Sequence, residues 1–301
     1  MFNPLDFACP LCRTRLEFCA VDELFCPCDR TTYKQVDGIW RFLIAERATY
    51  LEQFIREYAT VRQAEGRGSP DSNYYRALPF HDLTGRFSND WQIRAASFRT
   101  LLRLIEPSPP LTILDLGAGN GWLSYRLSQR EHRVGAVDLQ TNAYDGLGAH
   151  VHYDAPFVPL QAEFDHLPLA EQQIDLAIFN SSFHYSSRYE TTLGETLRVL
   201  KPRGRVVILD TPIYHDAGSG EQMVRERQTQ FQRAHGFPSN AIKSENYLTY
   251  ARLAQLAQAL NLRWQFVKPF YGWRWMKKSL IARVRGTREP AQFMLVIGQP
   301  C

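Results

Sequence analysis

The sequence predicts an α/β fold built on a doubly wound parallel sheet, with a small cysteine-rich module in front of it. An apolar run, a glycine-rich turn and a helical pattern follow one another from residue 113, and further apolar runs at 133–137, 174–180 and 206–210 suit buried strands. Five of the six cysteines lie in the first thirty residues. A chain of 301 residues is long for one small domain, so a core with an added module and insertions is expected.

The N-terminal module is expected to span residues 1–44 and to bind zinc. Two cysteine pairs, in Cys-Pro-Leu-Cys and Cys-Pro-Cys, can supply thiolates to a tetrahedral site. The predicted ligands are Cys9, Cys12, Cys26 and Cys28. The pattern resembles a zinc ribbon, in which two residues normally separate the second pair, so Cys19 or Asp29 is an alternative ligand and a metal-free module is another alternative. A closed four-ligand site in a module of about forty residues indicates a structural role.

Residues 45–110 are expected to form a helical linker and lid. Helical character extends over 41–62, and the glycine- and serine-containing stretch 65–72 indicates a loop. A further helix is predicted over 91–105, because its apolar residues recur at helical spacing and Asp90 can cap its first turn.

The turn after the first core strand indicates a nucleotide-type cofactor site. Gly117, Gly119 and Gly121 allow a tight turn and a close approach of backbone to ligand. A dinucleotide fingerprint would need its third glycine at the position of Trp122, whose bulk argues against that class. The next predicted strand ends at Asp138, whose carboxylate can accept hydrogen bonds from ribose hydroxyls in either class of cofactor site.

The turn, with Asp115 in front of it, resembles the first motif of class I S-adenosylmethionine-dependent methyltransferases with a type 11-like core. Further motifs follow in the family's order from about residue 111 to residue 262. The resemblance implies a Rossmann-like sheet of seven strands, closed by strands at 264–267 and 292–297. It places the core at 111–301, with lid insertions near 211–246 and 268–290, and it implies S-adenosylmethionine as the cofactor.

The same resemblance implies which residues hold the cofactor. Residues 161–169 are similar to the acid-containing turn that contacts the adenine amino group, with Glu163 as the acid and Asp165 as its competitor. In the family, segments before the first core strand form a lid, so Tyr75 and Arg94 could line the pocket, with ordinary packing as the alternative. The implied cofactor-binding residues are Asp115, Gly117, Ala118, Gly119, Asn120, Gly121, Asp138, Leu139, Glu163, Phe164, Asp165 and Asn180.

The chemistry implied is in-line transfer of a sulfonium methyl group, driven largely by holding the acceptor close and in line. A hydroxyl or acidic carbon acceptor would need a base. His184 and Tyr185, after the fourth core strand, are the predicted catalytic residues, with His184 preferred because imidazole titrates near neutral pH. A structural histidine is the alternative, and an amine or thiol acceptor would need no base.

A basic, aromatic segment at 264–288 carries the clearest charge signal. No acid occurs between residues 246 and 288, whereas arginine and lysine recur and tryptophan, tyrosine and phenylalanine lie between them. Such a segment suits an anionic membrane, RNA phosphates or a phosphorylated substrate, and the alternative is a packed helix with a solvated basic face.

These observations predict a methyltransferase that acts on a small-molecule or lipid-like, anionic acceptor. One alternative is methylation of ribosomal RNA guanine, because such enzymes also carry an N-terminal zinc site. A second alternative is a non-catalytic, cofactor-binding partner subunit. The oligomeric state is left open. A cytoplasmic protein is expected, because the sequence has no leader pattern and no run of about 18 apolar residues, and because clustered cysteines suit a reducing compartment.

Overall fold

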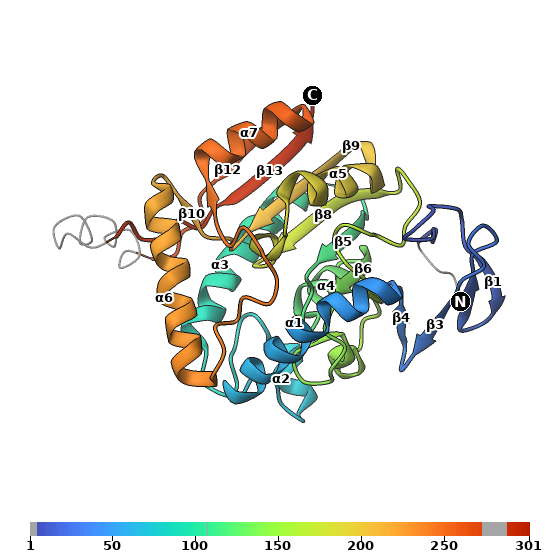
Figure 1. Ribbon diagram of the computed structural model, residues 1–301, viewed down its shortest axis with the longest axis horizontal. Coiled ribbons are helices and arrows are strands. Elements are labelled where there is room, and N and C mark those ends of the chain that lie inside the picture. Colours follow the sequence, from blue (N-terminus) through green and yellow to red (C-terminus); the bar gives the residue numbers. More distant parts are fainter. Residues whose placement is uncertain (1–4, 107, 273–287) are drawn as a thin grey trace.

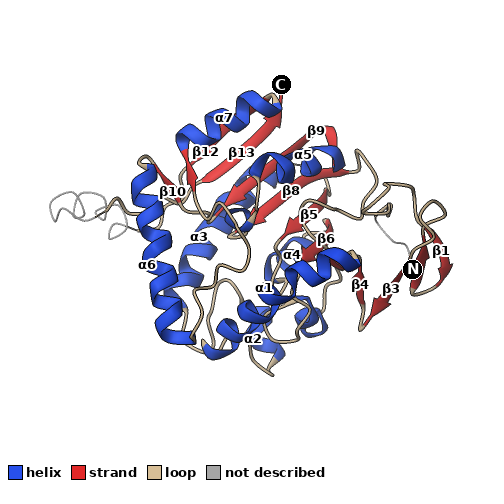
Figure 2. Ribbon diagram, in the orientation of Figure 1, coloured by secondary structure: helices blue, strands red, loops and turns tan. Residues whose placement is uncertain are grey.

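The structure is a computed structural model that describes residues 5–106, 108–272 and 288–301. Helices flank one large sheet, and the N-terminal strands extend it at one end (Figures 1 and 2). The sheet has eleven strands in the order β1-β2-β3-β4-β7-β6-β5-β8-β9-β13-β12. Their bounds are β1 Glu17–Ala20, β2 Glu23–Phe25, β3 Thr32–Val36, β4 Ile39–Arg41, β5 Thr112–Leu116, β6 Arg133–Asp138, β7 Val158–Gln161, β8 Ile174–Asn180, β9 Leu200–Leu209, β12 Leu262–Val267 and β13 Leu295–Pro300.

Seven of these strands, β7-β6-β5-β8-β9-β13-β12, confirm the predicted doubly wound core. β7, β6, β5, β8 and β9 pair in parallel, and β13 runs antiparallel between β9 and β12. Successive residues of β8 are buried on opposite faces of the sheet: Leu176 belongs to one apolar cluster and Ala177 to the other. Burial on both faces explains why the sequence shows continuous apolar runs here instead of alternation.

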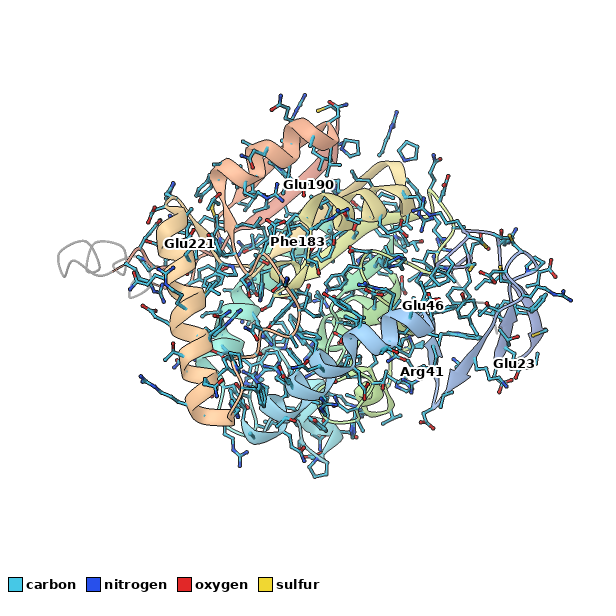
Figure 3. All side chains as sticks on the ribbon, viewed as in Figure 1. Glu23, Arg41, Glu46, Phe183, Glu190 and Glu221 are labelled. Atoms are coloured by element: carbon cyan, nitrogen blue, oxygen red, sulfur yellow. The ribbon has the colours of Figure 1, made fainter. Side chains whose placement is uncertain are left out.

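Two layers of helices cover the faces of the core sheet. α2, α3 and α4 pack on one face, and α5 and α7 pack on the other. Figure 3 shows Phe183, which is fully buried, inside the molecule, whereas Glu221 and Glu23 lie at its periphery. The helices are α1 Ala45–Ala64, α2 Ser72–Ala77, α3 Ser88–Ile105, α4 Trp122–Ser128, α5 Tyr189–Val199, α6 Ala217–His235 and α7 Tyr250–Leu260, with short 3-10 turns η1 Leu147–His152 and η2 Phe183–Tyr185.

The N-terminal strands are continuous with the core sheet. β1 to β4 form an antiparallel meander, and β4 then pairs in parallel with β7, with Trp40 opposite Leu160. The rings of Phe7, Trp40 and Phe42 pack on one another with centroids 5.2 to 6.1 Å apart. The N-terminal part therefore shares its apolar core with the sheet, and its predicted boundary at residue 44 stays a prediction.

Several element boundaries differ from those that the sequence predicts. α3 begins at Ser88 because the Asp82 carboxylate accepts the Phe87 amide at 2.6 Å, so Asp90 lies in the first turn and does not cap the helix. The last strand begins at Leu295, three residues later than predicted, because Gln292 pairs instead with Ile213 in an isolated bridge. Most of the helix expected in the basic segment lies outside the described residues.

The long connection after β9 contains α6 and two short strands, β10 (Ile213–Tyr214) and β11 (Leu248–Thr249), which pair in parallel. Asp216 caps α6 by accepting the amides of Gly218 and Ser219. Along the described ranges, each helix is too short or too polar to cross a bilayer.

Asp115, in the middle of the sheet, joins β5 to α4. It is 1% exposed, and its Oδ2 accepts a hydrogen bond of 2.8 Å from the Ser124 hydroxyl on the first turn of α4. Its Oδ1 is buried and has no hydrogen-bond partner among the residues that the structure describes. Burial raises the pKa of the Asp115 carboxyl to about 7, and the nearby Asp138 charge adds to this effect.

We expect Asp115→Asn to be more stable than the unmodified protein at pH 8. Because the folded-state pKa lies above the unfolded one, the native state holds a proton that the unfolded chain loses between about pH 4 and 7, so the free energy of unfolding falls as the pH rises. The asparagine side chain still accepts from Ser124 and carries no charge. Urea denaturation at pH 5 and 8 should show the advantage growing with pH, by up to about 3 kcal/mol between these two pH values. An advantage that is the same at both pH values would contradict this assignment.

Candidate functional site

A cavity opens at the carboxyl ends of four neighbouring parallel strands. Its walls include 117–120 after β5, 138–140 at the end of β6, 162–165 after β7 and 180–182 at the end of β8. Parallel strands bring these segments to one edge of the sheet although they are far apart in the sequence. The cavity lies where the order of the strands reverses around β5, which is the usual place for a ligand in an open α/β sheet.

The glycine turn after β5 requires glycine at two positions for steric reasons. Gly117, Gly119 and Gly121 all have positive φ angles. A Cβ atom on Gly117 would lie 2.3 Å from the Ser182 side chain, and one on Gly121 would lie 2.6 Å from the Phe157 ring. The bare backbone of the turn therefore forms a wall of the cavity.

Asp138 holds this turn against the end of β6. Its two carboxylate oxygens accept the amides of Gly119 and Gln140, each at 2.8 Å. Burial raises the pKa of the Asp138 carboxyl, and these two hydrogen bonds oppose the shift. Asp138 lines the cavity, as the sequence predicts for an acid that accepts from hydroxyl groups.

Both candidate acids of the turn after β7 line the cavity. Glu163 forms a bidentate ion pair with Arg47, with N–O distances of 2.6 to 3.1 Å. Asp165 accepts the Thr192 hydroxyl at 2.5 Å, and its pKa is raised by burial. The two carboxylates therefore differ in their partners: Glu163 is bound by the Arg47 guanidinium, and Asp165 is bound by the neutral Thr192 hydroxyl.

One face of α1 covers the cavity. The side chains that line it recur every three or four residues, which is one helical face. Arg47 contacts Glu163 near the start of the helix, and Arg62 forms an ion pair with the buried Asp145 near its end. The Gln140 side chain also donates through its Nε2 to the Ile55 carbonyl at 2.8 Å. The lining residues of α1 are Arg47, Leu51, Phe54, Tyr58 and Arg62.

Arg94, on α3, also reaches the cavity, but Tyr75 does not. Within the described part of the chain, Arg94 forms no ion pair or hydrogen bond and lies over the Trp91 ring, 4.8 Å from its centroid. Burial lowers the pKa of its guanidinium. The Tyr75 hydroxyl donates to the Tyr144 carbonyl at 2.8 Å, and its ring stacks on His152, so it has a packing role.

The two predicted catalytic residues, which follow β8, differ in their position relative to the cavity. Tyr185 lines the cavity, whereas His184 does not. Burial lowers the pKa of His184 to about 3, so its imidazole is neutral at physiological pH. Its Nδ1 is buried, and no atom in the described part of the chain forms a hydrogen bond with it. The geometry therefore favours Tyr185 over His184, the reverse of the order expected from the sequence.

Most of the predicted cofactor-binding residues meet at this cavity. Two of them are not part of its lining: Asp115 lies beneath the turn, bonded to Ser124, and Gly121 faces Phe157. The expected lid before the first core strand includes α1, but none of the individual residues of α1 that line the cavity was predicted, although Leu51, Phe54 and Tyr58 show helical spacing in the sequence. Those predicted residues that line the cavity are Gly117, Ala118, Gly119, Asn120, Asp138, Leu139, Glu163, Phe164, Asp165 and Asn180.

A second hollow adjoins the first between α1 and α6. Phe54, Tyr58 and Tyr185 belong to both hollows, and their rings contact one another with centroids 5.7 to 6.0 Å apart. Phe231 and Arg227, on α6, line the second hollow but not the first. Arg227 donates to the Asn246 side chain and forms no ion pair with any described residue. The second hollow thus combines aromatic walls with two arginines, Arg227 and Arg62, and one carboxylate, Glu65, which forms an ion pair with Arg62.

The structure brings together three of the four predicted metal ligands. The thiols of Cys9, Cys12 and Cys26 lie beside the Asp29 carboxylate. Cys28, predicted as the fourth ligand, is exposed and is not part of this group, so Asp29 takes the place that the sequence analysis gave to Cys28. Cys19 is exposed as well.

Comparison with known proteins identifies the family of the central segment. Residues 114–208 match the family model for a methyltransferase domain. The malonyl-[acyl-carrier protein] O-methyltransferase of Buchnera aphidicola is 30% identical over 131 residues, which cover 44% of this chain and 52% of that protein. The chain thus spans about half the length of this curated relative.

Solved structures share the fold. The YcgJ protein of Bacillus subtilis superposes with a TM-score of 0.53 at 16% identity, covering 69% of this chain and 99% of that one. A geranyl diphosphate methyltransferase solved with its substrate and sinefungin gives a TM-score of 0.52 at 16% identity, covering 84% and 100%. Residues 114–208 therefore match a methyltransferase domain by sequence, and the chain shares the α/β fold of these two solved structures.

Proposed function

We propose that this protein transfers a methyl group from S-adenosylmethionine to a small-molecule acceptor. The observation that carries the proposal is the cavity at four strand ends, where a glycine turn, a strand-end carboxylate and an acid-containing turn meet. The matched methyltransferase domain contains or adjoins each of these groups.

The residues present fit the cofactor in three places. Asp138 offers carboxylate oxygens to ribose hydroxyls, and the turn at 162–165 brings Glu163 and Phe164 to the cavity for the adenine. The side-chain oxygen Oδ1 of Asn180 is buried in the cavity wall and has no hydrogen-bond partner among the described residues, which suits a donor such as the ammonium group of the methionine part. Arg94 supplies a buried positive charge for the carboxylate of that part.

The acceptor is proposed to enter through the second hollow. Its aromatic walls suit a flat or apolar body, and Arg227 suits an anionic group on that body. α1 covers the cofactor cavity, which favours a small acceptor over an RNA helix. Two similar proteins are named for a carrier-bound malonyl group and for geranyl diphosphate, which supports an acyl- or prenyl-like acceptor over a nucleic acid.

The protein's own contribution to the reaction is to hold the acceptor and exclude water. When bound, the cofactor supplies an activated methyl group. Tyr185 lies between the two hollows, where its hydroxyl can position an acceptor and pass on a proton. Neutral His184 stands outside the lining, so we assign it a packing role.

Asp138→Ala should weaken binding of S-adenosylhomocysteine by about 100-fold, because the substitution removes the ribose acceptor and releases the Gly119 amide. Isothermal calorimetry on the two proteins measures this. Asp175→Ala, whose carboxylate bonds the Thr112 amide and Lys201 away from the cavity, is the control and should bind normally. Unchanged affinity in Asp138→Ala would remove the cofactor assignment.

Arg94→Ala should discriminate between two cofactor fragments. S-adenosylhomocysteine carries the carboxylate that Arg94 is proposed to bind, whereas methylthioadenosine lacks the amino-acid part. We expect the variant to lose about 10-fold to 100-fold in affinity for the first and to bind the second as the unmodified protein does. Equal losses for both ligands would mean that Arg94 supports the cavity only by packing.

Methyl-labelled S-adenosylmethionine, added to an extract of the source organism with the protein, should label a low-molecular-weight or lipid fraction. The proposed acceptor fits a hollow lined by single side chains, and the Asp138→Ala variant should give no label above background. Fractionation before and after ribonuclease treatment decides between the acceptor classes. Label that is recovered in RNA and released by ribonuclease would contradict the small-molecule assignment.

A further inference from the structure

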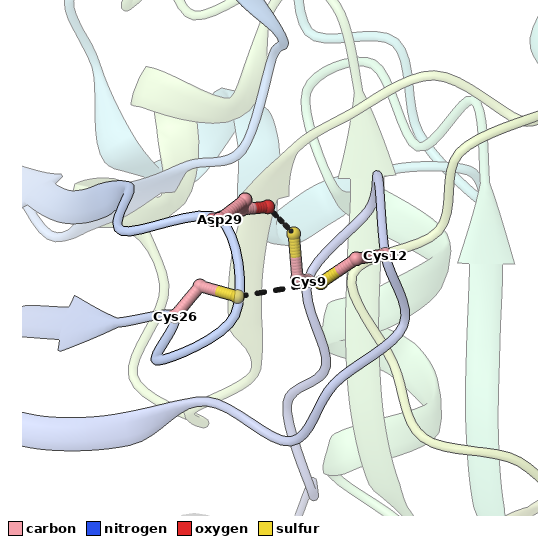
Figure 4. A group of neighbouring side chains, drawn as sticks. All are labelled: Cys9, Cys12, Cys26 and Asp29. Atoms are coloured by element: carbon pink, nitrogen blue, oxygen red, sulfur yellow. Dashed lines mark hydrogen bonds between the residues drawn. The ribbon is translucent and has the colours of Figure 1, made fainter.

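The cysteine cluster of the N-terminal module lies away from the cofactor cavity and is independent of the proposed methyl transfer. The three thiol sulfurs and one carboxylate oxygen lie within 4.8 Å of one another (Figure 4). Cys9 Sγ is 2.7 Å from Asp29 Oδ2, and Cys12 Sγ is 3.4 Å from Cys26 Sγ. Cys9 and Cys26 are buried in the apolar core.

The four groups come from two turns of the same shape. In the first turn, the Cys9 carbonyl accepts the Arg13 amide at 2.9 Å and the Cys9 amide donates to the Thr14 carbonyl at 2.8 Å. In the second turn, the Cys26 carbonyl accepts the Arg30 amide at 2.9 Å and the Cys26 amide donates to the Thr31 carbonyl at 2.9 Å.

The backbone conformation repeats as well, at an offset of 17 residues. Arg13 and Arg30 occupy corresponding positions and both have positive φ, at 63° and 58°. The two sequences are Cys-Pro-Leu-Cys-Arg-Thr and Cys-Pro-Cys-Asp-Arg-Thr. In this alignment, Asp29 stands where the first turn has Cys12 and Cys28 stands where it has Leu11.

This correspondence explains why Cys28 is not a ligand candidate. Leu11 is 51% exposed, and Cys28 at the equivalent position is exposed too, so the third residue of each turn points to solvent. The first and fourth residues of each turn bring their ligand atoms together, within 4.8 Å of one another, although Cys12 in a fourth position is itself partly open to solvent. The first turn therefore supplies two thiolates to a tetrahedral ion between the turns, and the second turn supplies one thiolate and one carboxylate.

The donor set and its spacing fit a divalent ion. Tetrahedral zinc with bonds of about 2.0 to 2.3 Å needs ligand atoms roughly 3.5 to 3.8 Å apart, and the observed separations bracket that value. Thiolate is a soft ligand that selects zinc over magnesium or calcium, and the carboxylate is a common fourth donor. All four coordination positions are taken by protein side chains, which is the arrangement of a structural site.

We propose that the N-terminal module binds one structural zinc ion through Cys9, Cys12, Cys26 and Asp29, with Cys28 outside the site. The ion fixes the two turns against the edge of the methyltransferase sheet. Arg13, in the first turn, forms an ion pair with Glu195 of α5, and Glu195 in turn accepts the Leu167 amide after the acid-containing turn. The zinc site thereby supports the loop that follows β7.

The test is the metal content and the cobalt spectrum of the full-length chain and its variants. The unmodified protein, expressed with zinc, should contain about one zinc ion per chain by mass spectrometry. Cys28→Ser is the matched control and should retain it, whereas Cys26→Ser should lose it. Asp29→Asn should weaken zinc binding by about tenfold or more in competition with a chromophoric chelator.

The cobalt-substituted protein gives the sharper readout, because charge-transfer absorption rises with the number of thiolate ligands. Asp29→Cys should increase this absorption by about one third, from three thiolates to four. Protein without zinc, equal metal loss in Cys28→Ser and Cys26→Ser, or no gain of absorption in Asp29→Cys would each overturn the proposal. If circular dichroism shows that a variant is unfolded, the cobalt spectrum of the unmodified chain decides the ligand set. Absorption typical of three thiolate ligands supports the proposal, and absorption typical of four contradicts it.

Discussion

The hydrogen bond from the Gly119 amide to the Asp138 carboxylate joins the two strand ends on which the cavity depends. It fixes the backbone of the turn after β5 against the end of β6, and the positive φ angles of the turn leave that backbone bare. Parallel pairing of β5 with β8, and of β6 with β7, then brings the remaining walls to the same edge. A ligand at this edge meets peptide groups and a carboxylate that are already held in place, which lowers the entropy cost of binding.

Ion pairs hold α1 over this edge, and they also show which charge is left over. A buried charge is costly unless a partner compensates it. Arg47 and Arg62 satisfy this condition through Glu163 and Asp145, and in doing so they attach both ends of the helix to loops at the strand ends. Arg94 lines the same cavity without such a partner among the described residues. Arg94 thus differs from Arg47 and Arg62 in having no direct ion pair with a described residue, although the charges of Asp210 and Asp145 act on it from a greater distance.

The N-terminal module and the methyltransferase domain form one body. β4 pairs with β7, and the apolar side chains of the module join the core cluster that includes strands β5 to β9. The Arg13–Glu195 ion pair adds a polar link from the first cysteine turn to α5. The loop after β7 lies between the module and the cofactor cavity, so order in the cysteine turns and order at the acid-containing turn depend on the same contacts.

The sequence by itself determined the fold class, the glycine turn and the acids at the strand ends, because these features are local. An apolar run followed by glycines, or by an acid, predicts a buried strand and a turn at its end without reference to distant parts of the chain. It also contained the repeated Cys-Pro turns, which show Asp29 in the position of Cys12. Only the tertiary structure decided that α1 and Arg94 close the cavity and that Asp115 and His184 turn away from it. Which way a side chain points depends on how distant elements pack on it, and no local pattern records that packing.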